Sequence, residues 1–508
     1  MKDFFKKHEG SITGTISVFD RLILKGYLPM SYPDAAEKFF AMRGVLLKEF
    51  KDFTKAQTET LKLHAQQMAQ KANRPYEYLN RYVRKEEYVR KIAKRDGIQE
   101  GLICVLAVNE ENHAFALRYG EGRPRLKKNS PRCLTLYFYY LDRHFGFMHV
   151  RLSTWMPFSI QVYVNGHDWL ARQMTAKNIP FTQVENALVG IEDCSKAQAI
   201  AGRFPTLPWE KILHAFARRV NPLFKTILSG MEYYWVIDQA EYATDVMFRN
   251  HDILDALYLN WQKHAAVCTQ AEDVMRFMGR KLHGSFNSVI QTDAKYRPTV
   301  TRIKHTVRGN WLKMYNKHGI VLRVETVINR PREFRIGRLG RGKRAVDWSP
   351  MPKRISSLKR YAEICGRANR AYLQALAQVD NPAEAYRQLD RLCEPQKLAN
   401  QRVRGLNPIR EKDQALFKAV VHGEHFIQGF RASDLAMRLE IIPPETPSER
   451  RKHSARLNRL LRLLRGHGLI ARIPRSRRYK ITDIGMKLMN AAIDLRTCGL
   501  PNILKQAA

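Results

Sequence analysis

Two carboxylates lie in stretches where their chemistry is unexpected. Asp20 falls within "TISVFDRLILKG", a β-branched stretch that predicts a strand. Glu325 is one of two acids between residues 297 and 344, a segment that also holds 14 Lys and Arg. Converging carboxylates can hold the Mg²⁺ ions of two-metal phosphoryl transfer, which lie about 4 Å apart. Asp20, Glu325 and Asp245 are therefore candidate catalytic residues, and Asp20 and Glu325 are candidate metal ligands.

Each of these carboxylates also has an ordinary explanation. Glu325 is placed to pair with Arg323 or with a cross-strand Lys313, and Asp20 beside Arg21 fits a turn. Ion pairs of this kind are common in a basic protein and need no metal. Both explanations stay open, so the sequence does not decide whether the protein is an enzyme.

The stretch "YYWVIDQAEYATDVMF" holds three further acids and is assigned to a helix. On a helix Asp238, Glu241 and Asp245 are spaced so that they share a face. Like charges in this arrangement repel one another by a few tenths of a kcal/mol. A metal ion or arginine side chains must compensate, and a net charge of +39 favours arginine.

Two stretches resemble known nucleic-acid modules in part. "RHFGFMHVRL" is similar to the aromatic strand of RNA-recognition domains at Arg143, Phe145, Gly146 and Phe147, but His144 and Met148 depart from that pattern. A hairpin whose aromatic side chains build a sheet core is the favoured explanation. "WLKMYNKHGIVLRVETVINRPREF" resembles a strand pair of rolling-circle replication initiators. That resemblance implies a histidine pair for a metal and a tyrosine nucleophile.

The histidine pair of such initiators has no counterpart in this sequence, where His149 stands alone in "FMHVRL". Tyr233 and Tyr234 are the candidate nucleophiles under that interpretation. Phosphate-binding loops of the G-x-x-x-x-G-K-[ST] and G-x-G-x-x-G types are missing, as is H-E-x-x-H. ATP hydrolysis and zinc-peptidase chemistry therefore have no motif to support them.

The charge of the chain predicts a polyanionic partner. The 508 residues are 44% hydrophobic, enough for folded cores, and carry a formal net charge of +39. Nucleic acid is the expected partner, either DNA or RNA for the central basic segment. The candidate nucleic-acid-binding residues of that segment are Lys304, Arg308, Lys313, Lys317, Arg341, Lys343 and Arg344.

The segment 448–480 contains a basic amphipathic helix followed by a hairpin. Leu457, Leu460, Leu461 and Leu464 are spaced to form one apolar face. Three helices, a basic hairpin and a closing helix resemble the winged helix-turn-helix domains of bacterial transcription regulators, which implies DNA binding through the third helix and the hairpin tip. The residues so assigned are Arg456, Arg459, Arg462, Arg472, Arg475, Arg477, Arg478 and Lys480.

The pattern of elements predicts a multidomain α+β protein. We expect an N-terminal α+β domain over 1–190, a helical segment with a basic β-hairpin over 191–350, a helical connector over 351–405 and a winged-helix domain over 406–508. The whole chain is also similar to a widespread uncharacterised family of basic bacterial proteins of about 500 residues. "FDRLILKG", "YYWVIDQAEYATDVMF" and "KMYNKHGIVLRVETVIN" are among the residues that carry this similarity, which implies no activity.

Seven scattered cysteines and a polar start without an apolar run predict a cytoplasmic protein with no membrane partner. The most concrete function that these patterns support is Mg²⁺-dependent DNA processing of the transposase or nuclease type. A non-catalytic DNA-binding regulator, or the protein part of an RNA–protein particle, is the alternative, and a rolling-circle initiator is a further one. The sequence does not indicate an oligomeric state.

Overall fold

The computed structural model describes most of the chain, which forms two compact units. Unit 1 comprises Met1–Thr13, Phe248–Val324 and Arg367–Ala508, and unit 2 comprises Gly14–Met247 and Glu325–Gly366. The described residues are 2–80, 82–119, 123–280, 288–297, 300–339, 346–377, 379, 390, 392–398, 401–422, 425, 429–474 and 476–499.

Unit 2 is built on a sheet whose strands come from distant parts of the sequence. These strands, in their order across the sheet, are β15 (Val321–Val327), β11 (Tyr234–Phe248), β1 (Ile12–Tyr27), β8 (Ile160–Val164), β7 (Gly146–Ser153), β6 (Arg132–Asp142), β3 (Gly101–Glu111) and β2 (Tyr76–Tyr78). β1 pairs antiparallel with β8, with Leu22 opposite Val164. From β8 to β3 the neighbours are antiparallel, and β2 joins β3 in parallel.

The sheet is hydrophobic because its central strands are buried on both faces. In β3 the residues from Leu102 to Val108 are all buried, which is typical of an interior strand without polar alternation. α4 (Lys85–Arg95) places Val89 and Ile92 against Ile103 of this strand, within one core cluster. β3, β4, β6, β7 and β8 overlap the stretches 101–109, 115–120, 134–142, 146–154 and 159–166, where β-rich runs between turn signals predict strands, whereas β5 was not predicted.

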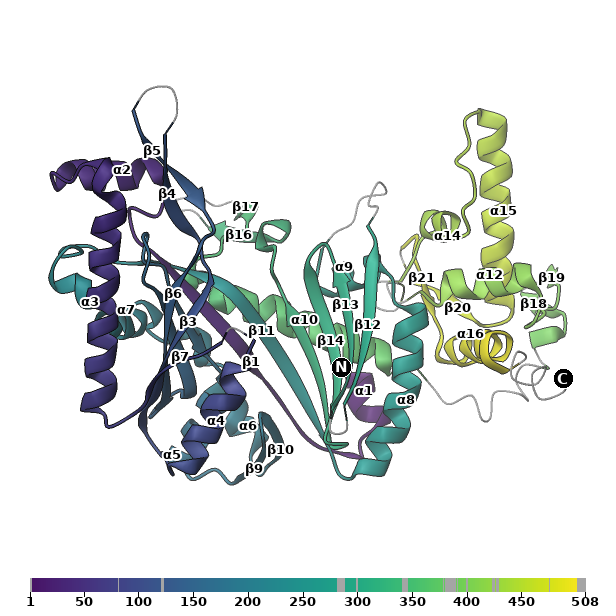
Figure 1. The fold of residues 1–508 in the computed structure, drawn as a ribbon. Coiled ribbons are helices and arrows are strands. Elements are labelled where there is room, and N and C mark those ends of the chain that lie inside the picture. The colour runs from purple at the N-terminus through teal and green to yellow at the C-terminus, as the bar shows by residue number, and fades with distance from the viewer. Residues whose placement is uncertain are drawn as a thin grey trace, which may run out of the picture. The chain divides into compact units, whose positions relative to one another are not determined.

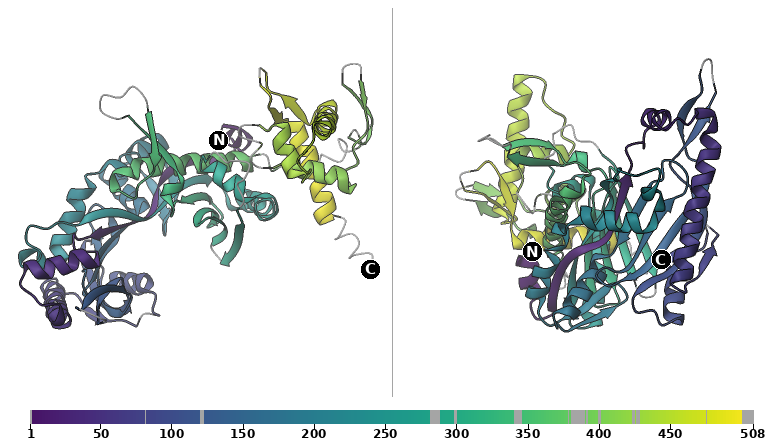
Figure 2. Two further views of the ribbon diagram at one scale, coloured as in Figure 1. Left: turned by 90° about the horizontal axis from the view of Figure 1, so that it is seen from above. Right: turned by 90° about the vertical axis from the view of Figure 1, so that its left-hand side faces the viewer.

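Helices and two-stranded hairpins surround the sheet of unit 2. α3 and α4 contact β3, and α5 and α7 contact β7 (Figure 1). The β4–β5 hairpin, against which α2 packs, projects beyond the sheet (Figure 2). The bounds of these elements are α2 (Pro33–Met42), α3 (Phe50–Lys71), β4 (Ala114–Arg118), β5 (Arg125–Asn129), α5 (Gly166–Ala176), β9 (Phe181–Val184), β10 (Ala187–Ile191), α6 (Cys194–Ala201), α7 (Trp209–Val220), β16 (Arg335–Leu339), β17 (Val346–Pro350) and α10 (Leu358–Leu376).

The helix predicted for "YYWVIDQAEYATDVMF" is wrong, because this stretch forms the 15-residue strand β11. Side chains alternate along a strand, so Glu241 and Asp245 share one face and Asp238 lies on the other. Asp238 accepts a hydrogen bond from Gln161 Nε2 at 3.1 Å. The three acids therefore do not share a face, and only two of them point the same way.

Unit 1 contains the basic hairpin region and the C-terminal elements. β12 (Ile290–Arg297), β13 (Val300–Val307) and β14 (Asn310–Lys317) pair antiparallel. β15 follows β14 in the sheet order, with residues 321–324 in unit 1 and 325–327 in unit 2, so the predicted single hairpin is part of a larger array. The Gly-containing "KHGI" between two strand-like stretches predicts the turn of the hairpin at His318-Gly319, and the structure confirms it with positive φ at both residues. The helices that precede this array are α1 (Lys2–Lys7), α8 (His251–Cys268) and α9 (Ala271–Phe277).

The C-terminal part of unit 1 consists of helices around a small apolar core. Leu457, Leu461 and Leu464 are buried in this core, and Leu460 packs against it, as the predicted apolar face requires. β20 and β21 pair antiparallel, with Ile470 opposite Ile481. The elements are β18 (Gln396–Leu398), β19 (Gln401–Val403), α12 (Glu411–Val420), α14 (Ala432–Arg438), α15 (Pro447–Gly466), β20 (Ile470–Arg472), β21 (Tyr479–Ile481) and α16 (Asp483–Asp494).

The described residues thus form a mixed α and β structure with a large sheet, as predicted. The four domain ranges inferred from the sequence stay predictions. Among the described helices, none combines the length and the apolar character that crossing a bilayer requires.

Candidate functional site

Three neighbouring strands of unit 2 bring three carboxylates together. Asp20 comes from β1, Glu241 from β11 and Glu325 from β15, and these strands are adjacent in the sheet. One carboxylate oxygen of each residue lies within 4.8 Å of the other two. All three side chains are buried, with Glu325 only 1% exposed. We name Asp20, Glu241 and Glu325 the carboxylate triad.

Contacts along β1 and β11 explain why Asp20 meets Glu241. Thr15 Oγ1 donates a hydrogen bond to the Asp245 carbonyl oxygen at 3.0 Å, and the hydroxyls of Ser17 and Thr244 lie 2.9 Å apart. As the residue number rises along β1, the partner on β11 falls, so the two strands run antiparallel. Continued by three residues, the same register places Asp20 opposite Glu241.

His167 links the triad to the other acid of β11. Its Nε2 lies 3.1 Å from Asp245 Oδ2, and its Nδ1 lies 3.0 Å from Asp20 Oδ1. His167 and Asp245 are fully buried. Asp245 is therefore beside the triad rather than in it, and the imidazole fixes the orientation of Asp20 from behind.

The N-terminus of α5 holds His167 in this position. Asn165 caps the helix by accepting hydrogen bonds from the backbone N–H groups of His167 and Asp168. Its Nδ2 also lies 3.5 Å from Asp20 Oδ1. Gly166 allows the helix to approach β1, because a Cβ at this position would lie 2.1 Å from the Phe19 carbonyl oxygen.

Burial shapes the electrostatics of this helix end. Burial raises the pKa of the Asp168 carboxyl, which nearby Arg90 and His167 oppose and the negative charge of Asp20 reinforces. Removing carboxylates from water disfavours their charged form, so a buried acidic cluster needs compensating positive charge. A cation bound by the triad would supply such charge.

The donor set of the triad fits a hard divalent cation. Carboxylate oxygens are the ligands that Mg²⁺ and Mn²⁺ prefer, whereas zinc sites usually include Cys or His. Mg²⁺ is commonly held by one or two carboxylates together with substrate phosphates and water. The residues present can thus hold such an ion. Nothing in the triad distinguishes Mg²⁺ from Mn²⁺.

The sequence pointed to two members of the triad and missed the surrounding residues. Asp20 and Glu325 converge, and Glu241, which the sequence placed on a helix, completes the group. His167 and Asn165 were not selected, although "VYVNGHDW" carries a signal for them. An Asn-Gly pair after a predicted strand, followed by a helical pattern, indicates a capped helix whose first residues face the strand end.

The tyrosines considered as nucleophiles lie away from the triad along β11. Tyr233 is buried, donates a hydrogen bond to the Phe158 carbonyl oxygen at 2.7 Å and accepts one from Asn221 Nδ2 at 3.1 Å. Burial raises the pKa of its hydroxyl. Tyr234 is 53% exposed and begins β11. The Tyr233 hydroxyl is therefore part of a buried hydrogen-bond network in the core.

The stretch "RHFGFMHVRL" forms the turn and strand of the β6–β7 hairpin. Phe145 and Phe147, which would have to stack on bases in an RNA-recognition strand, are each 4% exposed. Asp142 Oδ1 accepts hydrogen bonds from the N–H groups of His144 and Phe145 and so closes the turn. The buried aromatic core explains this stretch.

His149 on β7 is packed between aromatic rings, 5.0 Å from Tyr163 and 4.8 Å from Tyr139. Burial lowers its pKa to about 3, and the positive charges of Arg21, Arg151 and Lys85 act in the same direction.

The folded-state pKa of His149 lies below the ordinary value of about 6.5, so the unfolded chain binds its proton first as pH falls. The stabilising contribution is complete above pH 6.5 and is lost as pH falls toward 3. We expect His149→Phe, which keeps an aromatic ring, to make the unfolding free energy measured with urea depend less on pH. Between pH 6 and 4.5 its slope against pH should be smaller than that of wild type by up to about 1.4 kcal/mol per pH unit. The exposed His113→Gln is the control, and equal slopes for wild type and His149→Phe would refute this assignment.

The central basic residues differ in their exposure. Arg308 is exposed and Lys304 half-buried, whereas Lys313 and Lys317 are 6% and 7% exposed. Lys304 Nζ lies 4.1 Å from the centre of the Trp311 ring. The predicted residues Arg341, Lys343 and Arg344 lie outside the described part of the chain.

The C-terminal basic residues present their side chains at the surface of α15 and of the hairpin. Arg456, Arg459 and Arg462 are exposed on α15, and Arg462 donates a hydrogen bond to Gln401. Around the hairpin, Arg475 lies outside the described residues. Exposed there are Arg472, Arg477 and Lys480, while Arg478 is half-buried.

No protein-family model matches the chain, and neither a curated protein nor a solved structure does.

Proposed function

We propose that this protein binds nucleic acid and carries out metal-dependent phosphoryl transfer on DNA, the chemistry of transposases and nucleases in mobile-element processing. The observation that carries the proposal is the convergence of Asp20, Glu241 and Glu325 on three adjacent strands. The chain has a net charge of +39, so a buried group of three acids is a local concentration of negative charge in a positively charged protein. Buried charged groups gather at functional sites.

Each residue of the site has a defined role in this proposal. The triad would hold Mg²⁺, which when bound neutralises charge on the phosphoryl oxygens and lowers the pKa of a coordinated water. Asp20, Glu241 and Glu325 hold their oxygens in place because three paired strands fix their backbones. His167 and Asn165 orient Asp20 by contacts of 3.0 Å and 3.5 Å. Asp245 holds His167 in turn.

DNA binding is assigned to the C-terminal elements. The order α12, α14, α15, the β20–β21 hairpin and α16 supports a winged helix, in which α15 enters the major groove and the hairpin contacts phosphate. The outward face of α15 carries Arg456, Arg459 and Arg462, opposite its buried leucines.

Substituting both Arg456 and Arg459 by alanine is expected to weaken duplex binding and to lower the salt dependence. Removing one cation that neutralises a phosphate reduces the slope of log K against log salt by about 0.9. Fluorescence anisotropy of a labelled duplex at several salt concentrations measures both effects. Lys412→Ala is the control, because it also removes an exposed positive charge but lies on α12 rather than on α15. An unchanged slope in the double variant would remove α15 from the interface.

The function is tested by incubating the full chain with labelled single- and double-stranded DNA in Mg²⁺, Mn²⁺ or EDTA. Cleavage or strand joining that requires the metal and is lost in Glu241→Gln supports the proposal. DNA binding without any metal-dependent change in the DNA, under every condition, argues against it.

A non-catalytic DNA- or RNA-binding protein is the second candidate, and one observation favours it. Asp20 and Asp245 both contact His167, so part of the acidic cluster also serves a buried polar network. If the triad is structural in the same way, Glu241→Gln lowers stability without affecting any reaction on DNA. The same assay therefore separates the two candidates.

A further inference from the structure

Two adjoining cavities of unit 2 form a groove at one end of the strands that carry the triad. The larger has a volume of about 1090 Å³ and the smaller about 180 Å³, and Tyr27 and Tyr32 line both. β1 ends at Tyr27 and β11 begins at Tyr234, which also lines the larger cavity. We name this continuous space the tyrosine groove.

Aromatic rings are presented to solvent in the tyrosine groove. Tyr32 is 65% exposed and Tyr234 is 53% exposed, although aromatic side chains of this size usually bury most of their surface. Cations accompany two of the rings: Lys128 Nζ lies 5.3 Å from the centre of Tyr32, and Lys25 Nζ lies 5.1 Å from that of Tyr27. Exposed rings beside cations are the surface on which nucleobases stack.

The charge of the groove is positive. Its only described acids are Glu232 and Glu333, and Arg218 donates a hydrogen bond to Glu232 at 2.7 Å. Cationic side chains outnumber these acids and come from four separate segments, as an extended anionic chain would need. They are Lys25, Lys128, Arg330, Arg332, Lys353 and Arg354.

The backbone fixes these cations beside the rings. The N–H of Ile237 donates to the Lys353 carbonyl oxygen at 2.7 Å, and Val236 and Arg354 form an antiparallel bridge. The N–H of Met351 donates to the Phe334 carbonyl oxygen at 2.8 Å. The basic segment that follows β17 is thereby held against the beginning of β11.

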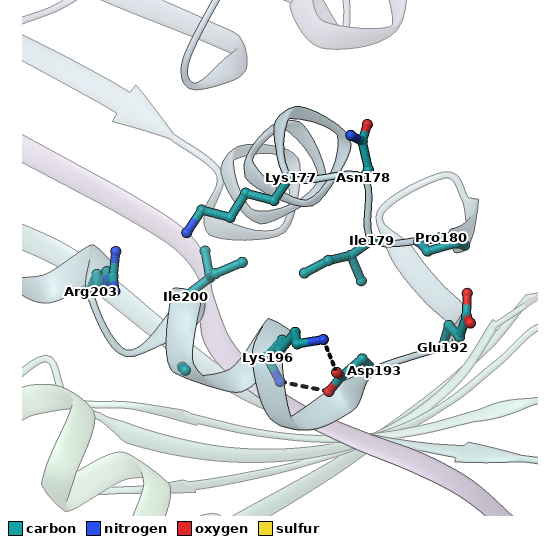
Figure 3. Close-up of a pocket in the computed structure, with 10 residues that line it drawn as sticks. Lys177, Asn178, Ile179, Pro180, Glu192, Asp193, Lys196, Ile200 and Arg203 are labelled. Carbon is teal, nitrogen blue, oxygen red and sulfur yellow. Dashed lines mark hydrogen bonds and ion pairs between the residues drawn. The ribbon is translucent and has the colours of Figure 1, made fainter.

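A second basic cavity of unit 2 lacks the aromatic component. It has a volume of about 760 Å³ and is lined by Lys177, Lys196 and Arg203, with no aromatic side chain among its described lining residues (Figure 3). Lys196 Nζ also forms an ion pair with Asp193 Oδ2 at 3.0 Å. Charge alone binds any phosphate, whereas charge with open rings selects bases that are unstacked.

The tyrosine groove and the carboxylate triad share their strands. Seven residues separate Asp20 from Tyr27 on β1 and Tyr234 from Glu241 on β11, which at about 3.3 Å per residue spans roughly 23 Å. On the side of β15, Asn329 lines the groove four residues after Glu325. Because side chains alternate along a strand, the odd separations on β1 and β11 place Tyr27 and Tyr234 on the opposite face of the sheet from Asp20 and Glu241, so the groove is a site separate from the triad.

We propose that the tyrosine groove binds single-stranded nucleic acid, with Tyr32 and Tyr234 stacking on bases and the surrounding Arg and Lys contacting phosphates. The groove goes beyond the proposed function as a binding site separate from the triad, and binding there needs no metal. The occupant is a flexible single strand because a base inside a duplex cannot offer its face to a side chain.

The test uses the full chain in EDTA with a fluorescent single-stranded DNA or RNA and excess unlabelled duplex, which occupies sites that prefer duplex. Tyr32→Ala and Tyr234→Ala are each expected to weaken single-strand binding roughly 5- to 150-fold. Tyr32→Phe, which keeps the ring, should bind like wild type. Arg332→Ala should lower the salt slope by about 0.7.

Tyr78→Ala and Arg203→Ala are the matched controls, since Tyr78 is 60% exposed at the other edge of the sheet and Arg203 lines the cavity without rings. The proposed groove would be overturned if both tyrosine-to-alanine variants bound single strands as tightly as wild type, or if the control variants lost as much single-strand affinity. Binding that follows these expectations without any metal-dependent cleavage supports the groove and rejects the proposed function. Wild-type single-strand affinity in both tyrosine-to-alanine variants, together with metal-dependent cleavage of DNA by the wild type, rejects the groove alone.

Discussion

Glu325→Gln is expected to lower the metal-dependent reaction on DNA by roughly 10³-fold or more while DNA binding is retained. Glutamine keeps the size of the side chain but removes a negatively charged ligand from a site where one oxygen each of Asp20, Glu241 and Glu325 lies within 4.8 Å of the others. Loss of several kcal/mol of metal-derived transition-state stabilisation corresponds to this factor, at tenfold per 1.36 kcal/mol. Initial rates on labelled DNA at saturating Mg²⁺ measure it.

Stability gives a second and independent measure of the same substitution. Mn²⁺ should raise the unfolding temperature of wild type, since a ligand that binds only the folded state stabilises it, and should not raise that of the variant.

Asp238→Asn is the matched control for Glu325→Gln. It also removes one carboxylate charge, and it lies on β11 outside the triad. Its rate and its response to Mn²⁺ should equal those of wild type. If Glu325→Gln retains the wild-type rate, or if Asp238→Asn loses as much, the triad does not hold a catalytic ion.

Gly166→Ala is expected to lower the free energy of unfolding by about 3 kcal/mol or more. A Cβ at Gly166 would lie 2.1 Å from the Phe19 carbonyl oxygen and 3.0 Å from the Phe19 carbonyl carbon. The obstacle is backbone on a central strand, so no side-chain rotation relieves the clash, and overpacking of this kind usually costs about 1–3 kcal/mol. α5 must shift away from β1 and carry His167 with it.

Gly190→Ala provides the comparison, because a Cβ there would meet no described atom closer than 4.0 Å. Its unfolding free energy should stay within about 0.5 kcal/mol of wild type. Urea unfolding followed by tryptophan fluorescence compares the variants. Equal stability of Gly166→Ala and wild type would show that α5 does not approach β1 as described.

Local patterns in the sequence were enough to predict elements whose two faces differ. α15 alternates leucine and arginine with helical spacing, and its leucines are buried while Arg456 and Arg459 are exposed. The turn at His318-Gly319 was predictable because both residues tolerate positive φ. In each case the residues that set the structure are close together in the sequence.

β11 could not be predicted in this way, because it is buried along most of its length. Residues from Ala243 to Phe248 are all buried, so the polar alternation of a half-exposed strand is absent. Ala, Glu, Gln and Met in this stretch also have high helix propensity. Its position between β15 and β1 overrides that local preference.

The candidate site was predictable only where a residue was unusual in its own surroundings. Glu325 is conspicuous among the basic residues around it, and Asp20 interrupts an apolar strand. Glu241 carries no such signal, and "VYVNGHDW" indicates a capped helix at His167 but not its contact with Asp20, because that contact joins elements that are distant in the sequence and meet only in the folded structure. The spacing of neighbouring residues does not predict contacts between segments that are so far apart in the sequence.

The most direct test of the account is the anomalous diffraction of crystals soaked in Mn²⁺. We expect an anomalous peak between Asp20, Glu241 and Glu325, with carboxylate oxygens at about 2.0–2.2 Å, and we expect the peak to vanish in Glu325→Gln crystals. Wild-type crystals with Mn²⁺ elsewhere and none at the triad would contradict the central claim that these three carboxylates form a metal site.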